Sequence, residues 1–194
     1  MHVVRSEERD FLLRHRNGDR GAFAELVAEY RAPVYSYLLR CGVGEDDRDD
    51  LFQEAFLRIH RAADSYQDDR PVHPWIFTIV ANAVRSHLRR QRIRHLVHSD
   101  PSTANPAAEP ADTAPDGERR SAARQRVALV EQEIRELPPV QREVVLLACV
   151  EQLAQKEIAA ALEIPLNTVK THLRRARLAL AGALSRRERG EVTS

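Results

Sequence analysis

The sequence predicts an all-helical protein made of two small domains. Its 194 residues include only seven glycines and 5% aromatic residues, and Ala, Leu, Arg and Glu, which favour helices, are abundant. Neither half shows a convincing alternating strand pattern. Residues 98–117, HSDPSTANPAAEPADTAPDG, contain four prolines and no aromatic residue, so they bury too little surface to offset their chain entropy. We therefore expect domains at 1–97 and 119–194, joined by a flexible, acidic, Pro/Ala-rich linker at 98–118.

Three helical segments are predicted in the first domain. Apolar residues at helical spacing run from Phe23 to Cys41 and indicate one long helix or two that abut at Pro33. A second helix is expected over Asp47–Ala63. After a loop at Asp64–His73, a third is expected from Pro74, a residue suited to a first helical turn.

The second domain is predicted to hold four helices. The first ends at two consecutive prolines, the second follows them directly, and the last two form a helix-turn-helix. The apolar residues that mark the first pair are Val127, Val130, Ile134 and Leu137, then Val140, Val144, Leu147 and Ala148.

The helix-turn-helix, Ala154–Leu180, ends in a basic helix with two different faces. After a break at Glu163–Pro165, the apolar residues Val169, Leu173, Ala176 and Leu180 recur with helical period. The opposite face carries Asn167, Thr171, Arg174 and Arg175, with Thr168 and Lys170 on its flanks. Amide, hydroxyl and guanidinium groups on one exposed face suit a DNA major groove. On this segment alone, an ordinary solvated helix of a small bundle is the alternative.

The net charge of +1 hides a strong partition of charge along the chain. Residues 45–54 hold six carboxylates and one Arg, whereas residues 85–94 hold five Arg and no acid. Residues 170–189 hold seven basic residues and one Glu. Two basic patches with an acidic connector between them indicate contact with a polyanion at two places.

Several classes of protein and site are disfavoured. Cys41 and Cys149 lie far apart within apolar helical patterns, which indicates a reducing compartment and no disulfide or metal framework. The charged N-terminus does not resemble a signal peptide, and no apolar run approaches the roughly 18 residues of a membrane span. We expect a cytoplasmic protein without membrane insertion. His95 and His98 have a metal-compatible spacing, but no Cys or carboxylate cluster accompanies them, so neither a metal nor another cofactor is expected.

Two separate motifs resemble one known family. LPPVQREVVLL followed by KEIAAALEIPLNTVKTHLRRARLAL resembles region 4 of bacterial sigma factors. DLFQEAFLRIHRA followed by PWIFTIVANAVRSHLRR resembles their region 2. With both regions in the family's order and no central domain between them, the chain is similar to extracytoplasmic-function (ECF) sigma factors. The resemblance implies an initiation subunit that binds core RNA polymerase, recognises a two-part promoter and helps to melt it, and that is not itself an enzyme.

The resemblance also implies roles for individual residues. Asp50, Gln53 and Glu54 match the motif that docks on the coiled coil of the polymerase clamp. Contacts to the −10 promoter element and its phosphates would come from Trp75, Phe77, Asn82, Arg85, Arg89 and Arg90, although Trp75 and Phe77 could also be core aromatics. Contacts to the −35 element would come from Asn167, Thr168, Lys170, Thr171, Arg174 and Arg175. The implied partners are the β and β′ subunits of the polymerase, promoter DNA and an anti-sigma factor.

Some positions depart from the family pattern. Glu163 and Asn167 stand where glycine is common, and His60 and Pro74 replace a frequent Trp and Thr. The turn at Glu163 must therefore accept a residue with a Cβ atom. By resemblance the acidic linker would mimic RNA in the transcript channel, but a plain solvated tether fits equally well.

Two other functions were weighed. A conventional operator-binding regulator would use a similar helix-turn-helix, usually as a dimer on a palindrome, but it gives the first domain's motifs no role. A carboxylate-based metal enzyme, built on Asp46, Asp47, Asp49, Asp50 and Glu54, fits least well, because adjacent carboxylates on one helix mostly diverge.

Overall fold

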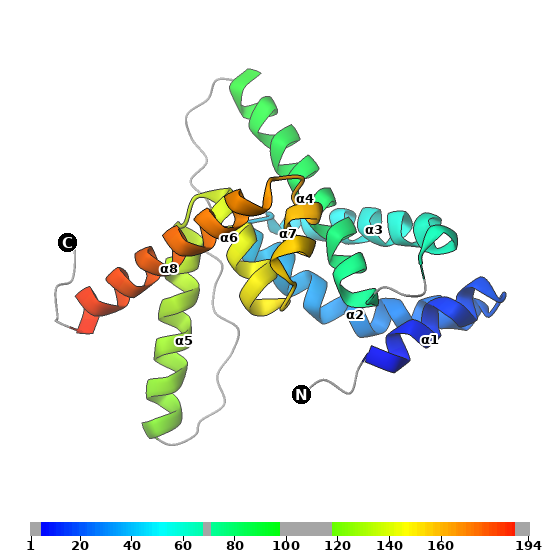
Figure 1. The fold of residues 1–194 in the computed structure, drawn as a ribbon, viewed down its shortest axis with the longest axis horizontal. Helices are drawn as coiled ribbons and strands as arrows, with labels where there is room; N and C mark the ends of the chain where they lie inside the picture. The colour runs from blue at the N-terminus through cyan, green and yellow to red at the C-terminus, as the bar shows by residue number, and fades with distance from the viewer. Residues whose placement is uncertain (1–4, 68–70, 98–117, 189–194) are drawn as a thin grey trace.

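The computed structural model describes residues 5–67, 71–97 and 118–188, and these residues contain helices but no strand (Figure 1). None of the described helices is long and apolar enough to cross a membrane. The elements of the first domain are α1 (Arg5–Arg16), α2 (Arg20–Cys41), α3 (Glu45–Ala62), the short 3₁₀ helix η1 (Ala63–Ser65) and α4 (Val72–Val97). Those of the second are α5 (Glu118–Glu136), α6 (Pro139–Val145), the π-helical turn η2 (Leu146–Val150), α7 (Gln155–Ala161) and α8 (Leu166–Glu188).

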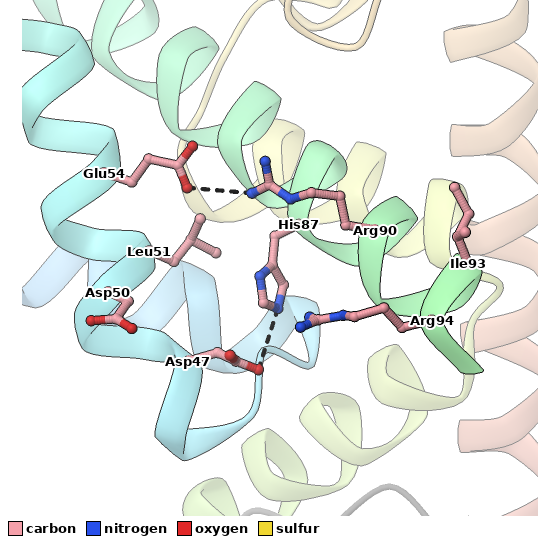
Figure 2. A pocket seen from close by; sticks show the side chains of 8 residues that line it. All are labelled: Asp47, Asp50, Leu51, Glu54, His87, Arg90, Ile93 and Arg94. Carbon is pink, nitrogen blue, oxygen red and sulfur yellow. Dashed lines mark hydrogen bonds and ion pairs between the residues drawn. The ribbon is translucent and has the colours of Figure 1, made fainter. Parts of the chain in front are cut away.

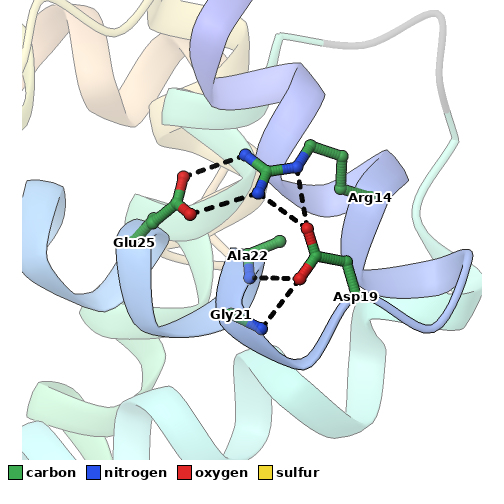
Figure 3. A network of polar contacts seen from close by, with 5 residues as sticks. All are labelled: Arg14, Asp19, Gly21, Ala22 and Glu25. Atoms are coloured by element: carbon green, nitrogen blue, oxygen red, sulfur yellow. Dashed lines mark hydrogen bonds and ion pairs between the residues drawn. The ribbon is translucent and has the colours of Figure 1, made fainter.

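The turn between α1 and α2 is fixed by a network of polar contacts (Figure 3). The Asp19 carboxylate caps α2 by accepting hydrogen bonds from the backbone N–H groups of Gly21 (2.9 Å) and Ala22 (3.3 Å). Arg14 donates to the same carboxylate and to Glu25, at 2.6 and 2.9 Å respectively. These contacts lower the pKa of Asp19, with the Arg14 hydrogen bond as the largest cause. The network thereby ties α1, which the sequence analysis did not predict, to α2.

Two helices of the first domain, α2 and α4, differ in detail from those that the sequence predicts. The segment around Pro33 forms one continuous helix rather than two. Helix α4 begins at Val72, two residues before Pro74, so Pro74 lies inside the first turn instead of starting it. Helix α2 ends at Gly42, whose φ of +87° allows its N–H to reach the carbonyls of Leu38 and Leu39.

In the second domain, α6 continues into the π-helical turn η2 before the chain reverses. The guanidinium of Arg142 on α6 lies at the C-terminal ends of two other helices. It donates to the carbonyl of Arg135 in the last turn of α5 and to that of Leu137 just after this helix, the latter at 3.3 Å. It also donates to the carbonyl of Cys41 at the end of α2, at 3.3 Å. A cation at a helix C-terminus is favoured by the helix dipole. Arg142 therefore stabilises its own domain and connects it to the first.

The two domains pack directly against each other. Helix α4 contacts α7, and α2 contacts both α5 and α6, so that α7 lies between α4 and α8 (Figure 1). Buried residues from both domains, such as Tyr37 and Phe77 in the first and Leu147 and Ile158 in the second, belong to one apolar cluster. This close packing of the two domains was not predicted from the sequence.

Candidate nucleic-acid interface

Helix α8 has the two faces that its sequence predicts. Val169, Leu173 and Ala176 are buried, and Leu180 is half-buried. The predicted DNA face is exposed at Asn167, Lys170, Thr171, Arg174 and Arg175, whereas Thr168 is half-buried. The Thr171 hydroxyl donates to the Asn167 carbonyl at 2.8 Å. An exposed row of amide and guanidinium groups on a supported helix can enter a major groove and bind base edges or phosphates.

The turn before α8 carries backbone strain. Glu163 adopts the left-handed region with φ of +50°, which costs a residue with a Cβ atom about 1–2 kcal/mol. The turn is closed by two hydrogen bonds, from the N–H of Glu163 to the carbonyl of Ala160 (3.3 Å) and from the N–H of Ile164 to that of Ala159 (3.1 Å). The Glu163 side chain is exposed. The turn accommodates this departure from glycine without burying a charge.

The aromatic residues of α4 do not form one exposed surface. The Phe77 side chain is 0% exposed, and its ring contacts those of His73 (4.7 Å between centroids) and Tyr37 (5.6 Å). Trp75 is half-buried, with its ring 5.0 Å from that of Tyr66. Phe77, expected at the −10 element, is therefore a core residue here, because its position on α4 directs it toward α2. Asn82 is half-buried.

The arginines of α4 differ in what they contact. Arg85 is half-buried and donates to the backbone carbonyl of Leu162, at the end of α7 in the other domain. Arg89 and Arg90 are exposed, and Arg90 lies 3.4 Å from the Glu54 carboxylate on α3. In this conformation Arg85 is thus engaged by protein, whereas Arg89 is open to a phosphate.

The acidic motif of α3 lies on the outside of the first domain. Leu51 and Phe52 are buried, as predicted, while Asp50 and Gln53 are exposed. Glu54 is half-buried and forms ion pairs with Arg58 and Arg90. The exposed face can thus meet a basic partner surface with carboxylate and amide groups.

A notch of about 530 Å³ separates the acidic part of α3 from the basic part of α4 (Figure 2). Asp47, Asp50 and Glu54 line it from α3, and Arg90 and Arg94 from α4. On its floor, the largely buried His87 has its Nε2 atom 3.5 Å from the Asp47 carboxylate. Opposite charges therefore face each other across the notch.

One residue of this surface was missed in the sequence analysis. Leu57 is 57% exposed and lies one turn beyond Gln53 on α3. Its spacing of seven residues from the exposed Asp50 places it away from the buried stripe, and this spacing could have identified it.

The described residues contain no group of three or more His, Cys, Asp or Glu side chains arranged to hold a metal ion. The side chains of His95 and His98 lie outside the part of the chain that is described. Both cysteines are free, and burial raises the pKa of the Cys41 thiol.

Comparisons with known proteins agree with this architecture. Residues 26–94 match the family described as Sigma-70 region 2, and residues 128–180 match Sigma-70, region 4. The chain is 30% identical to the RNA polymerase sigma factor CnrH of Cupriavidus metallidurans, over 87% of this chain and 89% of that protein. It is 30% identical to the ECF RNA polymerase sigma-E factor of Escherichia coli strain K12, over 86% and 88% of the two chains.

A solved structure of CnrH in complex with the cytosolic domain of CnrY covers 93% of this chain and 98% of its own, with 26% identity and a TM-score of 0.63. A structure of RpoE in complex with the anti-sigma factor NepR from Bartonella quintana shares the fold, at 20% identity and a TM-score of 0.67, over 84% of this chain and 96% of that one. These similarities set aside an operator-binding regulator and a metal enzyme, neither of which accounts for region 2. The chain belongs to the ECF sigma factors, the non-enzymatic subunits that bind core RNA polymerase to initiate transcription.

Proposed function

We propose that this sigma factor docks on core polymerase through the outer face of α3. The supporting observation is that Asp50, Gln53 and Leu57 are exposed side by side along that face, with the Glu54 carboxylate at its edge. A carboxylate- and amide-bearing face that ends in one exposed apolar residue fits a basic partner surface that also offers an apolar contact. We assign this partner to the clamp coiled coil of the β′ subunit.

The docking proposal is tested by measuring affinity for purified core polymerase. Replacing Asp50, Gln53 and Glu54 together by Ala removes the polar contacts, and Leu57→Asp separately places a charge at the apolar end of the face. Each variant is expected to lose at least tenfold in affinity while its far-UV circular dichroism is unchanged. Glu29→Ala, an exposed acid on α2, is the matched control. Wild-type affinity in both α3 variants would refute the assignment.

We further propose that α8 recognises the −35 element. The face of Asn167, Lys170, Thr171, Arg174 and Arg175 is the exposed side of a helix whose other side is buried, with Thr168 at its margin. Arg174→Ala or Arg175→Ala should cost about 1–3 kcal/mol at a cognate element if that residue reads a base. An equal loss on every sequence identifies a phosphate contact instead. Arg186→Ala, exposed near the far end of α8, controls for loss of positive charge.

The −10 element is assigned to α4 and to the loop before it. Trp75 and Asn82 are half-buried and supply a ring and an amide for extruded bases, and Arg85, Arg89 and Arg90 supply phosphate contacts. Asn82→Ala should impair transcription from a duplex promoter more than from a pre-melted one. Equal effects on the two templates would argue against a melting role.

Regulation by an anti-sigma factor is proposed from the relatives, since the solved structures of CnrH and RpoE each contain such a partner or its domain. The corresponding experiment is purification of the tagged chain from unstressed cells of its source. A stoichiometric second protein that inhibits transcription in vitro is the expected result, and an unaccompanied, fully active chain would contradict the proposal.

A further inference from the structure

Four polar contacts connect the two domains around their apolar interface. Arg40 on α2 forms an ion pair with Glu131 on α5 at 2.8 Å. His73 at the start of α4 lies 3.2 Å from the Glu151 carbonyl and 3.5 Å from its carboxylate. The other two contacts end on carbonyls: Arg85 on that of Leu162, and Arg142 on that of Cys41.

A buried carboxyl group lies near two of the residues that make these contacts, Arg85 and Arg142. Glu143 on α6 is 5% exposed. Arg85 on α4 and Arg142 on its own helix act on this carboxyl group, which in turn acts on Tyr37 and Cys41 of α2. Burial raises the pKa of Glu143 to about 7, although the two guanidinium groups act in the opposite direction. Because residues of the first domain surround this group, separation of the domains would return it to water.

We infer that these contacts form a proton-sensitive clasp that holds the two domains of the free chain together. A neutral Glu143 is buried at little cost, whereas an ionised one opposes closure. Acid therefore favours the closed form and alkali the open one.

The size of the effect follows from proton linkage. In the open form the pKa of Glu143 returns to its ordinary value of 4.5, and in the closed form it is about 7. Because the closed-state value is the higher one, closure is strongest below pH 4.5, weakens as the pH rises from 4.5 to 7, and changes little above 7. Between pH 5.5 and pH 8 the closing equilibrium constant should fall about 30-fold through Glu143 alone.

Closure has a consequence for promoter binding. For the promoter recognition proposed above, positions −35 and −10 lie about 25 base pairs apart by their names, or about 85 Å at roughly 3.4 Å per base pair. The closed chain holds Arg85 of α4 against Leu162, four residues before α8, so its two DNA-binding helices cannot reach both elements. A chain of 20 residues, the length of 98–117, can span at most about 70 Å, and this length is enough for the domains to separate. Opening of the clasp thus precedes recognition of a two-part promoter.

The clasp is tested by single-molecule energy transfer on the full chain, with dyes attached at Leu57 and Leu178, which are exposed on α3 and α8. The closed fraction is followed from pH 5.5 to pH 8 in the wild type, in Glu143→Gln and in Glu136→Gln, an exposed acid near the end of α5. We expect the wild type and Glu136→Gln to open as the pH rises. Glu143→Gln should stay more closed at pH 8 and lose most of the pH dependence. No polymerase or DNA is present, so the result does not depend on the docking and promoter assignments.

A second set of variants tests closure through surface residues that should not affect folding. Arg40→Glu should shift the population toward the open form, and the added Glu131→Arg should restore it by reversing the ion pair. If the wild type is closed at every pH from 5.5 to 8, the pH titration is repeated in the Arg40→Glu variant, in which the closed form is less stable. The inference is overturned if the free chain is open at every pH, or if the closed fraction does not change with pH in either the wild type or Arg40→Glu. It is also overturned if Glu143→Gln keeps the wild-type pH dependence.

Discussion

The left-handed residue in the turn between α7 and α8 yields a quantitative prediction. Glu163 has φ of +50° and an exposed side chain, so Glu163→Gly removes a backbone penalty of about 1–2 kcal/mol without removing buried contacts. Glycine also gains entropy in the unfolded chain, which costs about 0.4–1 kcal/mol. The balance is a stabilisation of about 0.5–1 kcal/mol. Glu163→Val should destabilise the domain instead, because a β-branched side chain tolerates this conformation least.

The assay is urea unfolding followed in parallel by far-UV circular dichroism and by tryptophan fluorescence. Trp75 is the only tryptophan in the chain, so fluorescence reports on the first domain and circular dichroism on both. Ala160→Gly, at an exposed position inside α7, is the matched control and should cost about 1 kcal/mol. The reasoning is refuted if Glu163→Gly lowers the free energy of unfolding, or if Glu163→Val matches the wild type.

Three further predictions concern stability. Arg142→Met keeps the apolar stem but removes hydrogen bonds from a charged donor, so it should cost about 2–3 kcal/mol in urea unfolding. Phe77→Ala should cost about 3–5 kcal/mol, as for other buried aromatics, with no extra defect on duplex promoters once stability is matched. Asp19→Ala should lower the thermal midpoint at neutral pH through loss of the α2 cap. Because Arg14 lowers the pKa of Asp19, the cap's contribution is fully present above the ordinary carboxyl pKa and fades as the pH falls below it, so the midpoints of wild type and Asp19→Ala should converge in acid.

Periodicity predicted the parts of the fold whose residues are close in sequence. The stripe of Val169, Leu173 and Ala176 is buried as expected, because successive turns of one helix determine which face it presents. Helix α1 was missed because Phe11, Leu12 and Leu13 are consecutive and show no helical spacing. For Phe77 the resemblance implies a −10 contact while a core position stays open; its burial depends on packing against α2, which local pattern does not reveal.

The contacts between the domains were beyond sequence reasoning for a different reason. Arg142 and Cys41 are 101 residues apart, and Arg85 and Leu162 are 77 apart. Each of these two contacts joins a side chain to a backbone carbonyl. Because every residue has a carbonyl, the sequence does not indicate which carbonyl accepts the hydrogen bond. The burial of Glu143 could not be predicted either, because an acidic residue on a short amphipathic helix is ordinarily exposed.

In the closed free chain, Arg85 and Arg90 on α4 each contact a protein group. Arg85 donates to a carbonyl in the closed form, and in the proposed open form a DNA phosphate takes the place of that carbonyl. Arg90 likewise pairs with Glu54, a residue of the proposed docking face, and its guanidinium is exposed enough for water to replace that partner. Arg85 thus has a partner both in the closed chain and in the proposed complex with DNA, so neither state leaves its charge buried without a partner. The exception is Glu143, which prefers to be neutral when closed and charged when open, and the balance between the two forms should therefore depend on this carboxyl group more than on any of the arginines.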